Sequence, residues 1–244
     1  ANAHRNFFTE FWGPALYKAG VRGNLSEVVR LGWGGAKSNI LPGAVLWVIG
    51  LALVISYYQI HTVAEILDQL GDFKLRSSPW FAILSTALFG SLIPWLVQNL
   101  FLQGGEKQPF RHVPWLLLFW GFHGWQVDWL YRIQAGLFGN EINFQTILKK
   151  TLVDEFIWVP FFAVWQLVLG YLIIEKDGSV KEFKAALKQK PFFDRVIPLM
   201  IANWVVWIPA VSLIYLFPLP LQLPLMNIIL ALWCLILTFF AKNA

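Results

Sequence analysis

The chain has 244 residues, of which 57% are apolar, 17% aromatic and 14% charged. Soluble domains carry about 25% charged residues, so too few charges are present here to cover a water-soluble globule, and the high hydrophobicity excludes a disordered chain. The composition therefore predicts an integral membrane protein. The formal net charge of +5 does not indicate nucleic-acid binding, because the basic residues lie between apolar runs. Cys234 is the one cysteine, which excludes a disulfide framework and a cysteine-cluster metal site within the chain.

The N-terminal 40 residues contain no apolar core of a signal peptide, so the first long apolar run is expected to direct its own insertion. Residues 7–33 combine aromatic and basic side chains, which fits either an amphipathic helix on the membrane surface or a polar tail packed on the loops. The glycine-rich stretch at 32–35 lacks the Lys and the Ser or Thr of a phosphate-binding loop, and we expect a flexible loop there.

Six apolar runs are long enough to cross a bilayer as helices, which takes about 20 residues each. In chain order they are 41–60, 79–102, 114–132, 152–174, 197–217 and 219–240. The runs are apolar on all sides and do not alternate as the strands of a membrane barrel do. The expected fold is therefore an all-α, polytopic transmembrane bundle of about six hydrophobic helices, four to six of them spanning; whether 197–217 crosses fully stays open.

Three regions follow from these runs: a polar or amphipathic N-terminal region at 1–40, an additional membrane helix and loop at 41–78, and a helical membrane domain at 79–244. If all six runs cross, 14 of the 19 Lys and Arg residues lie on the same side as both termini. Because Lys and Arg are enriched in cytoplasmic loops, both termini are expected on the cytosolic side. A basic stretch at 181–190 on that side is suited to anionic lipid, although such stretches are usually solvated loops.

Small residues in the second run, namely Ala82, Thr86 and Gly90, recur every four residues. In lipid, small residues let helix backbones approach closely, so this face is expected to pack tightly against a neighbouring helix. The fifth and sixth runs are separated by Pro218 and Pro220, with Pro224 close behind. These prolines are expected to break the helix and form a tight hairpin.

Prolines also lie inside three runs, at Pro94, Pro160 and Pro209. A proline has no backbone N–H, so each should free the carbonyl four residues earlier, those of Gly90, Phe156 and Val205, and kink its helix. Such kinks can line a cavity, but proline is also simply commoner in membrane helices.

Ionisable residues inside the membrane are a sharper signal, because each costs roughly 3 kcal/mol at the bilayer centre. Asp128 near the end of the third run and Asp154 and Glu155 at the start of the fourth are expected at similar depth. With Arg132, Lys149 and Lys150 they predict one polar cluster at a mouth of the bundle. Its members are either interfacial salt bridges that fix a hairpin or a charged vestibule of a solute path. His123, near mid-membrane, is interpreted as a hydrogen-bonded helix contact rather than a ligand of a metal or pigment.

Enzymatic function is not expected, because no zinc-protease motif, nucleophile elbow or phosphate-binding loop is present. The two adjacent carboxylates could serve in acid–base chemistry, but no nucleophile, metal-ligand set or cofactor motif accompanies them. We therefore predict no cofactor and no metal.

Several motifs between about residues 79 and 238 resemble those of one family of small membrane proteins. They are Lys149-Lys150-x-Leu152-x-Asp154-Glu155-x4-Pro160, Trp204-x2-Trp207-Ile208-Pro209, Pro218 followed by Asn227, Trp233 and Leu237-Thr238, and His123-x-Trp125. Together they resemble the family of the Mpv-seventeen protein of the mitochondrial inner membrane and the twenty-two-kilodalton peroxisomal membrane protein. The chain departs from that family where Glu155 replaces Gln, where Phe119-Trp120 replace Gly-Pro, and at Gln126, Ser212, Tyr215-Leu216 and Gln222; residues 1–78 have no counterpart.

The resemblance implies a pore that passes small solutes, located in the plasma membrane of a bacterium or in the mitochondrial inner or peroxisomal membrane of a eukaryote. Two hypotheses are therefore carried forward. In the first, the chain is a channel or solute pathway whose acidic mouth sets ion preference. In the second, it is a non-conducting structural or accessory subunit of a larger membrane complex, or assembles with copies of itself. Membrane lipids are its expected partners in both.

Overall fold

The computed structural model describes residues 25–101, 109–189 and 193–243, and its elements in these ranges are all helical. The all-α fold class is thereby confirmed. The α-helices are α3 (Leu25–Gln59), α4 (His61–Ser77), α5 (Trp80–Ala87), α6 (Ile93–Phe101), α7 (Val113–Phe138), α8 (Phe144–Val153), α9 (Val164–Glu175), α10 (Val180–Gln189), α11 (Phe193–Ile214) and α12 (Leu219–Asn243). Two π-helices, η1 (Leu88–Leu92) and η3 (Asp154–Ala163), and a short 3-10 turn, η2 (Phe110–His112), join them.

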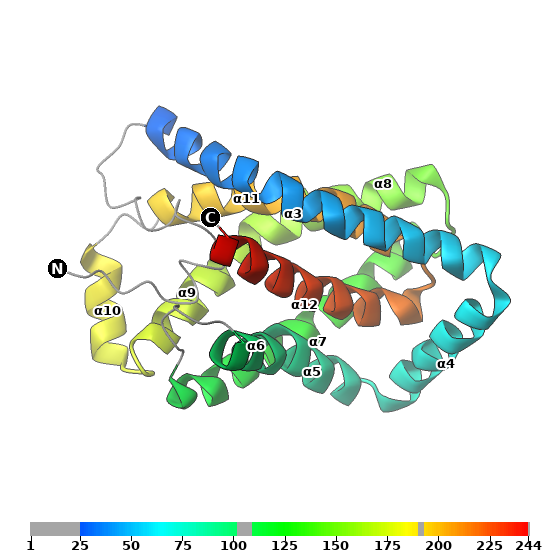
Figure 1. Cartoon of the computed structure of the whole chain (residues 1–244), viewed down its shortest axis with the longest axis horizontal. Helices are drawn as coiled ribbons and strands as arrows, with labels where there is room; N and C mark the ends of the chain where they lie inside the picture. Colours follow the sequence, from blue (N-terminus) through cyan, green and yellow to red (C-terminus); the bar gives the residue numbers. More distant parts are fainter. Residues whose placement is uncertain (1–24, 102–108, 190–192, 244) are drawn as a thin grey trace.

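The helices run back and forth between two ends of a bundle (Figure 1). At one end, called the α4 end here, lie α4 and the connections α7–α8 and α11–α12; α10 lies at the opposite end. The start of α3 and the end of α12 are both at the α10 end. Helices α3 and α11 lie side by side, and the indole N–H of Trp47 on α3 donates to the carbonyl of Val206 on α11 at 3.0 Å.

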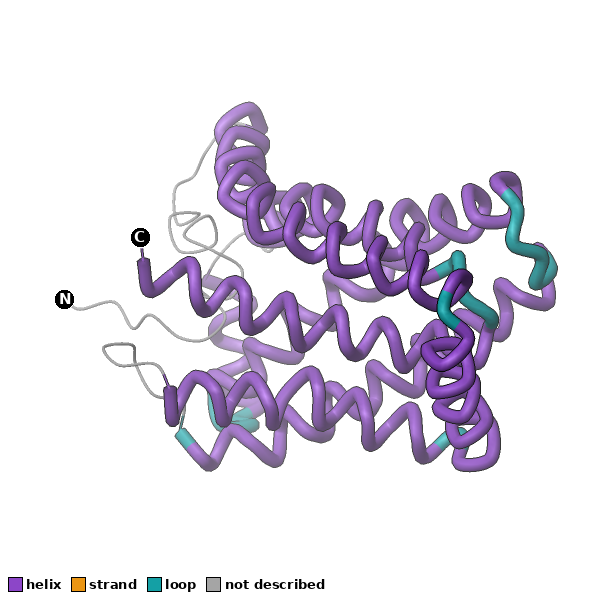
Figure 2. The backbone as a smooth tube through the Cα atoms, turned by 45° about the vertical axis from the view of Figure 1, so that its right-hand side comes forward, coloured by secondary structure: helices purple, strands orange, loops and turns teal. Residues whose placement is uncertain are grey.

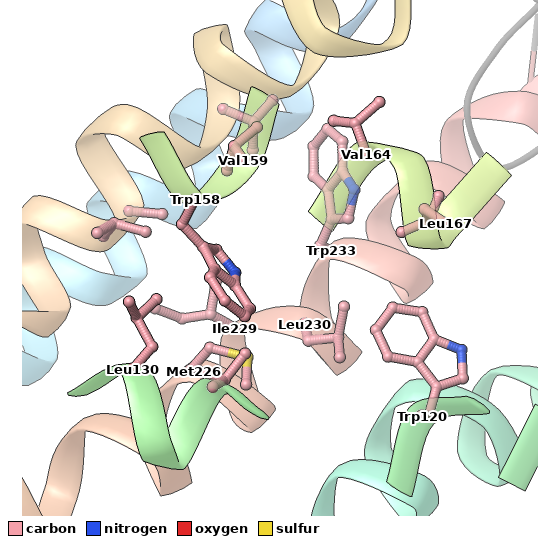
Figure 3. Close-up of a cluster of buried hydrophobic side chains, with 14 of the residues drawn as sticks. Trp120, Leu130, Trp158, Val159, Val164, Leu167, Met226, Ile229, Leu230 and Trp233 are labelled. Carbon is pink, nitrogen blue, oxygen red and sulfur yellow. The ribbon is translucent and has the colours of Figure 1, made fainter. Parts of the chain in front are cut away.

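Helix α12 occupies the centre of the bundle, between α3 and α11 on one side and α5, α6 and α7 on the other (Figures 1 and 2). Its consecutive residues Leu221 to Asn227 are all buried. Figure 3 shows Trp233, Leu230 and Met226 of α12 among Trp120 of α7 and Trp158 of η3. The sixth apolar run is thus apolar on all sides because protein surrounds it there, as expected for a central helix.

Three helical stretches of the described residues are long and apolar enough to cross a membrane: Asn39–Gln59, Trp80–Val97 and Phe144–Ile174. Leu199–Ile214 and Leu219–Trp233 are shorter apolar helices. The third predicted run lies in α7, which is not among these candidates, because polar residues interrupt its apolar sequence. Three of the six predicted membrane helices are therefore supported by length and hydropathy.

The outer faces of the bundle are more apolar than those of a soluble protein. Large apolar side chains such as Val48, Leu84 and Leu118 are more than half exposed on the outer faces, whereas Lys74 and Glu155 are each 1% exposed inside. Soluble monomers rarely expose large contiguous apolar patches and almost never bury charged residues unpaired. The exposed apolar faces and the three helices able to cross a membrane indicate a membrane location.

The glycine-rich stretch that was expected to be a flexible loop is helical. Helix α3 begins at Leu25, so the glycine-rich stretch at 32–35 continues into the first predicted membrane helix, and the loop prediction is wrong. Side chains one turn further, Ala36 and Asn39, are buried, and this packing outweighs the weak helix propensity of glycine. The predicted amphipathic stretch at 7–33 lies outside the described residues up to residue 24.

The segments after the first and fourth runs also form helices, α4 and α10. Helix α4 is amphipathic and buries Leu67, Gly71 and Lys74 along one face. The basic stretch at 181–190 lies largely in α10.

The prolines act differently from one another. Both π-helices occur beside a predicted kink, because Pro94 follows η1 and Pro160 lies within η3. Helix α11 ends at Ile214 and α12 begins at Leu219, so a break occurs around Pro218 as predicted. Pro220 lies in the first turn of α12, where a missing N–H costs no helical bond, and Pro224 lies inside that helix. The prediction that Pro224 contributes to the break is wrong.

Candidate functional site

The π-helix η3 presents Asp154 and Glu155 to the interior of the bundle, where both side chains are buried. In η3 each backbone N–H bonds the carbonyl five residues earlier, as the bond from Val164 to Val159 shows. Pro160 therefore frees the carbonyl of Glu155 rather than that of Phe156, which an α-helix would have freed. The indole N–H of Trp204 on α11 donates to this carbonyl at 2.7 Å, and this hydrogen bond stabilises the π-helix.

Asp154 is the end of a buried hydrogen-bond chain that joins three helices. The hydroxyl of Tyr215, just after α11, donates to Oδ2 of Asp154 at 2.8 Å, and Nε2 of Gln134 on α7 donates to the same hydroxyl at 2.9 Å. Nζ of Lys150 lies 5.7 Å from the centre of the Tyr215 ring. These hydrogen bonds fix the side chain of Asp154 between α7, α8 and α11.

Glu155 has weaker partners. Its carboxylate is approached by Nδ2 of Asn203 on α11 at 3.5 Å, the limit of a hydrogen bond. Among the described residues no Lys, Arg or His nitrogen lies within 4.0 Å of the carboxylate of Asp154 or Glu155. We call Gln134, Lys150, Asp154, Glu155, Asn203 and Tyr215 the Glu155 group.

Asp128 on α7 lies in a different environment. Nζ of Lys74 on α4 is 2.5 Å from its Oδ1, and Nε of Arg132 donates to Oδ2 at 2.8 Å. Ser78 accepts from Arg132 at 2.6 Å and donates to Oδ2 of Asp128 at 3.3 Å. We call Lys74, Ser78, Asp128 and Arg132 the Asp128 group; it attaches α4 to α7.

The expected single cluster is therefore two groups. Along α7, Gln134 lies six residues beyond Asp128, about 9 Å at 1.5 Å per residue. Tyr131 lies between them, and its ring meets that of Tyr215 edge-on with 5.6 Å between centroids. Lys149 is exposed and belongs to neither group.

His123 belongs to neither group. It lies between one and two helical turns before Asp128, nearer the α10 end of α7. Its ring stacks on Phe119 with 6.3 Å between centroids and meets Trp120 edge-on at 5.5 Å. Gln166 of α9 is its polar neighbour, and Nδ1 of His123 is buried without a well-aligned hydrogen bond. Within the described ranges, no three His, Cys, Asp or Glu residues are placed to hold a metal ion.

The small-residue face of the second run packs against α7. Ala82 and Thr86 are fully buried, and a Cβ added at Gly90 would lie 2.6 Å from the ring of Trp120. A Cβ at Gly124 of α7 would collide with Thr86 and with the carbonyl of Ala82. The sequence pattern of α5 showed one side of this contact and missed Gly124.

Thr86 and the neighbouring Ser85 also join α5 to the central helix. The hydroxyl of Thr86 donates to Oδ1 of Asn227 on α12 at 2.9 Å, and Nδ2 of Asn227 donates to Ser85 at 2.8 Å. On α11, Trp207 has a buried indole nitrogen without a hydrogen-bond partner, and Pro209 is accommodated within the helix.

Lys74, Gln134, Asn203, Tyr215 and Asn227 were not predicted as site residues. Lys74 had a detectable signal, because it lies three residues after Gly71 and seven after Leu67 on the apolar face of an amphipathic helix. The others are isolated polar residues in apolar runs, and only the packing of the helices brings them together.

Comparisons with protein-family models, curated proteins and solved structures found no match to this chain.

Proposed function

We propose that this chain is a six-helix integral membrane protein that forms a pathway for small solutes or ions, with both termini on the cytosolic side. The observation that carries the proposal is the burial of the Glu155 group between α7, η3 and α11. Ionisable residues within membrane segments are costly, and they typically mark substrate or ion pathways. The resemblance to the Mpv-seventeen family supports the same function, and membership in that family is part of the proposal.

The pathway lies beside α12 rather than on the bundle axis. Side chains of α12 such as Trp233 and Leu223 fill the centre, so a solute cannot pass there. Between α7, η3 and α11, in contrast, carboxyl, amide and hydroxyl groups meet, and such groups can replace the hydration shell of a passing solute.

Reconstitution into liposomes tests this function. Vesicles containing the protein should leak small solutes or ions faster than protein-free vesicles, and Asp154→Asn with Glu155→Gln should reduce the preference for cations over anions. The control is Glu65→Gln with Asp72→Asn, which removes two exposed carboxylates from α4 and should leave the preference unchanged. Leak at the rate of protein-free vesicles would exclude a pathway.

A non-conducting accessory subunit is the second candidate function. It is favoured by the filled centre and by an outward stripe of large side chains on α7, at Trp115, Leu118, Phe122, Trp125 and Trp129, all exposed. This candidate predicts stoichiometric co-purification with other membrane proteins in mild detergent. A monodisperse monomer that conducts would contradict it.

A further inference from the structure

The two polar groups differ in their balance of charged side chains. The Asp128 group contains one carboxylate and two basic side chains, and Arg132 is 46% exposed, so solvent can screen its charge. The Glu155 group contains two carboxyls and one ammonium, all in buried residues: Lys150 is 3%, Asp154 6% and Glu155 1% exposed. With every group ionised, the Glu155 group would carry one uncompensated negative charge.

An uncompensated charge in a low-dielectric interior is costly, and the usual response is for one group to become neutral. One proton on one of the two carboxyls makes the Glu155 group neutral. Asp154 is better suited to stay ionised, because it accepts a 2.8 Å hydrogen bond from Tyr215 and lies one helical turn after Lys150. Glu155 has only the 3.5 Å contact with Asn203 and is less exposed.

A second observation indicates that hydrogen-bond donors are lacking at this place. Gln134 is 1% exposed, and its amide nitrogen is used by Tyr215, while its Oε1 is buried without a hydrogen-bond partner. Buried acceptors normally have a donor. A proton bound in the group would add one hydrogen-bond donor to a group in which this buried acceptor has no donor.

We propose that Glu155 is a proton-binding site inside the bundle, with a neutral carboxyl at neutral pH and an anionic one after release. On release the O–H bond of the carboxyl breaks, its electron pair stays on the glutamate oxygen, and the proton passes to a water molecule, which becomes hydronium; uptake is the reverse. The titratable or charged groups on the surrounding elements are Asp154 on its own helix, Lys150 on α8, Tyr215 after α11, and Tyr131 and Asp128 on α7.

Its consequence for permeation rests on the proposed function. Where the chain conducts, release of the proton adds a negative charge beside the route, and the preference for cations over anions rises with pH.

Infrared spectroscopy of the full chain in lipid bilayers tests the proton site directly. At neutral pH, exposed carboxyls are ionised, so a carboxylic C=O band reports a buried protonated group. We expect such a band in the unmodified chain, a shift on labelling glutamate carboxyls with ¹³C, and its loss in Glu155→Gln. The band should persist in the control Glu65→Gln. Absence of the band, or failure of the glutamate label to shift it, would overturn the proposal; the label makes this decision without any variant.

Permeability measurements separate the two proposals. In conducting vesicles the cation preference of the unmodified protein should rise with pH, and that of Glu155→Gln should not. Vesicles that leak no faster than protein-free ones would remove the proposed function, while the infrared band still decides the proton site. A conducting protein whose Glu155 is ionised at neutral pH would retain the function and overturn the inference.

Discussion

The Asp128 group and the Glu155 group lie about 9 Å apart along α7, yet their carboxylates are held in different ways. Asp128 is enclosed by Lys74, Arg132 and Ser78, which come from α4, α7 and the residue after α4. Asp154 and Glu155 have neutral partners within hydrogen-bond distance and one ammonium further away. A closed ion pair fixes one helix on another, whereas a group short of a cation can change its protonation. The Asp128 group therefore serves to attach α4 to α7, whereas the Glu155 group is the candidate functional site.

The largest expected effect is that of Lys74→Met on stability. The substitution leaves Asp128 buried with only the half-exposed Arg132 as cation, and breaking a buried ion pair from one side costs about 3–5 kcal/mol. The measurement is denaturant unfolding of the purified protein in one detergent. Lys74→Met with Asp128→Leu, which removes both charges, should recover much of the loss; a single variant as stable as the unmodified protein would show that the pair anchors nothing.

The next largest loss of stability is expected at the contact between α5 and α7, one turn along α7 from Asp128. Gly124→Ala places a Cβ where Thr86 and the carbonyl of Ala82 already lie, and overpacking typically costs about 1–3 kcal/mol. Gly136 on the same helix has no atom within 4 Å of an added Cβ, so Gly136→Ala is the matched control and should not destabilise the protein. Equal stability of the two variants would contradict the close approach of α5 and α7.

Lys150→Met should destabilise the protein less than Lys74→Met does. Removal of Lys150 leaves two carboxyls that can each bind a proton, because burial favours the neutral form of a carboxyl, whereas removal of Lys74 leaves Asp128 beside the half-exposed Arg132. Unfolding under the same conditions compares the two variants. A larger loss for Lys150→Met would reverse the distinction between the groups.

A smaller effect is expected for Tyr215→Phe, which removes the hydroxyl between Asp154 and Gln134. The net value of such hydrogen bonds is about 1 kcal/mol. The comparison variant is Tyr58→Phe, which removes a hydroxyl that donates to the carbonyl of Leu216 at the exposed end of α3. Calorimetric or denaturant unfolding of both variants compares the loss of a buried hydrogen bond with that of an exposed one. Indistinguishable losses would argue against the chain of hydrogen bonds.

The smallest effect is that of Arg132→Gln. Its side chain is 46% exposed, and ion pairs of exposed groups contribute about 0–1 kcal/mol. The free energy of unfolding should change within that range, while a loss as large as that of Lys74→Met would mean that Arg132 holds Asp128 as firmly as Lys74 does.

The long apolar runs were sufficient to predict the all-α class, and three of them lie in helices long and apolar enough to cross a membrane. The inward position of Asp154 and Glu155 also followed from the sequence, since two carboxylates at the start of such a run avoid lipid by facing protein. The start of α3 at Leu25 could not be predicted, because packing that no local pattern reveals outweighs the weak helix propensity of the glycines at 32–35.

The division of the polar residues into two groups could not be predicted. The sequence places Asp128 and Asp154 at similar distances from the α7–α8 connection, but the groups meet α7 at different turns. Lys74 reaches Asp128 only because α4 folds across the bundle end, and Tyr215 reaches Asp154 only because α11 ends there. These are contacts between residues more than 50 positions apart, set by helix packing rather than by any local period.

The central position of α12 affects how the chain can assemble during synthesis. Helices α3, α4, α5, α6, α7 and α11 all contact α12, for example through Thr86 and Leu67, and α12 leaves the ribosome after all the other described helices. Until α12 has been made, those surfaces therefore lack their protein neighbour and must be covered by lipid or by another protein. A stop codon or frameshift upstream of Leu219 would leave a set of inserted helices without the one that brings them together.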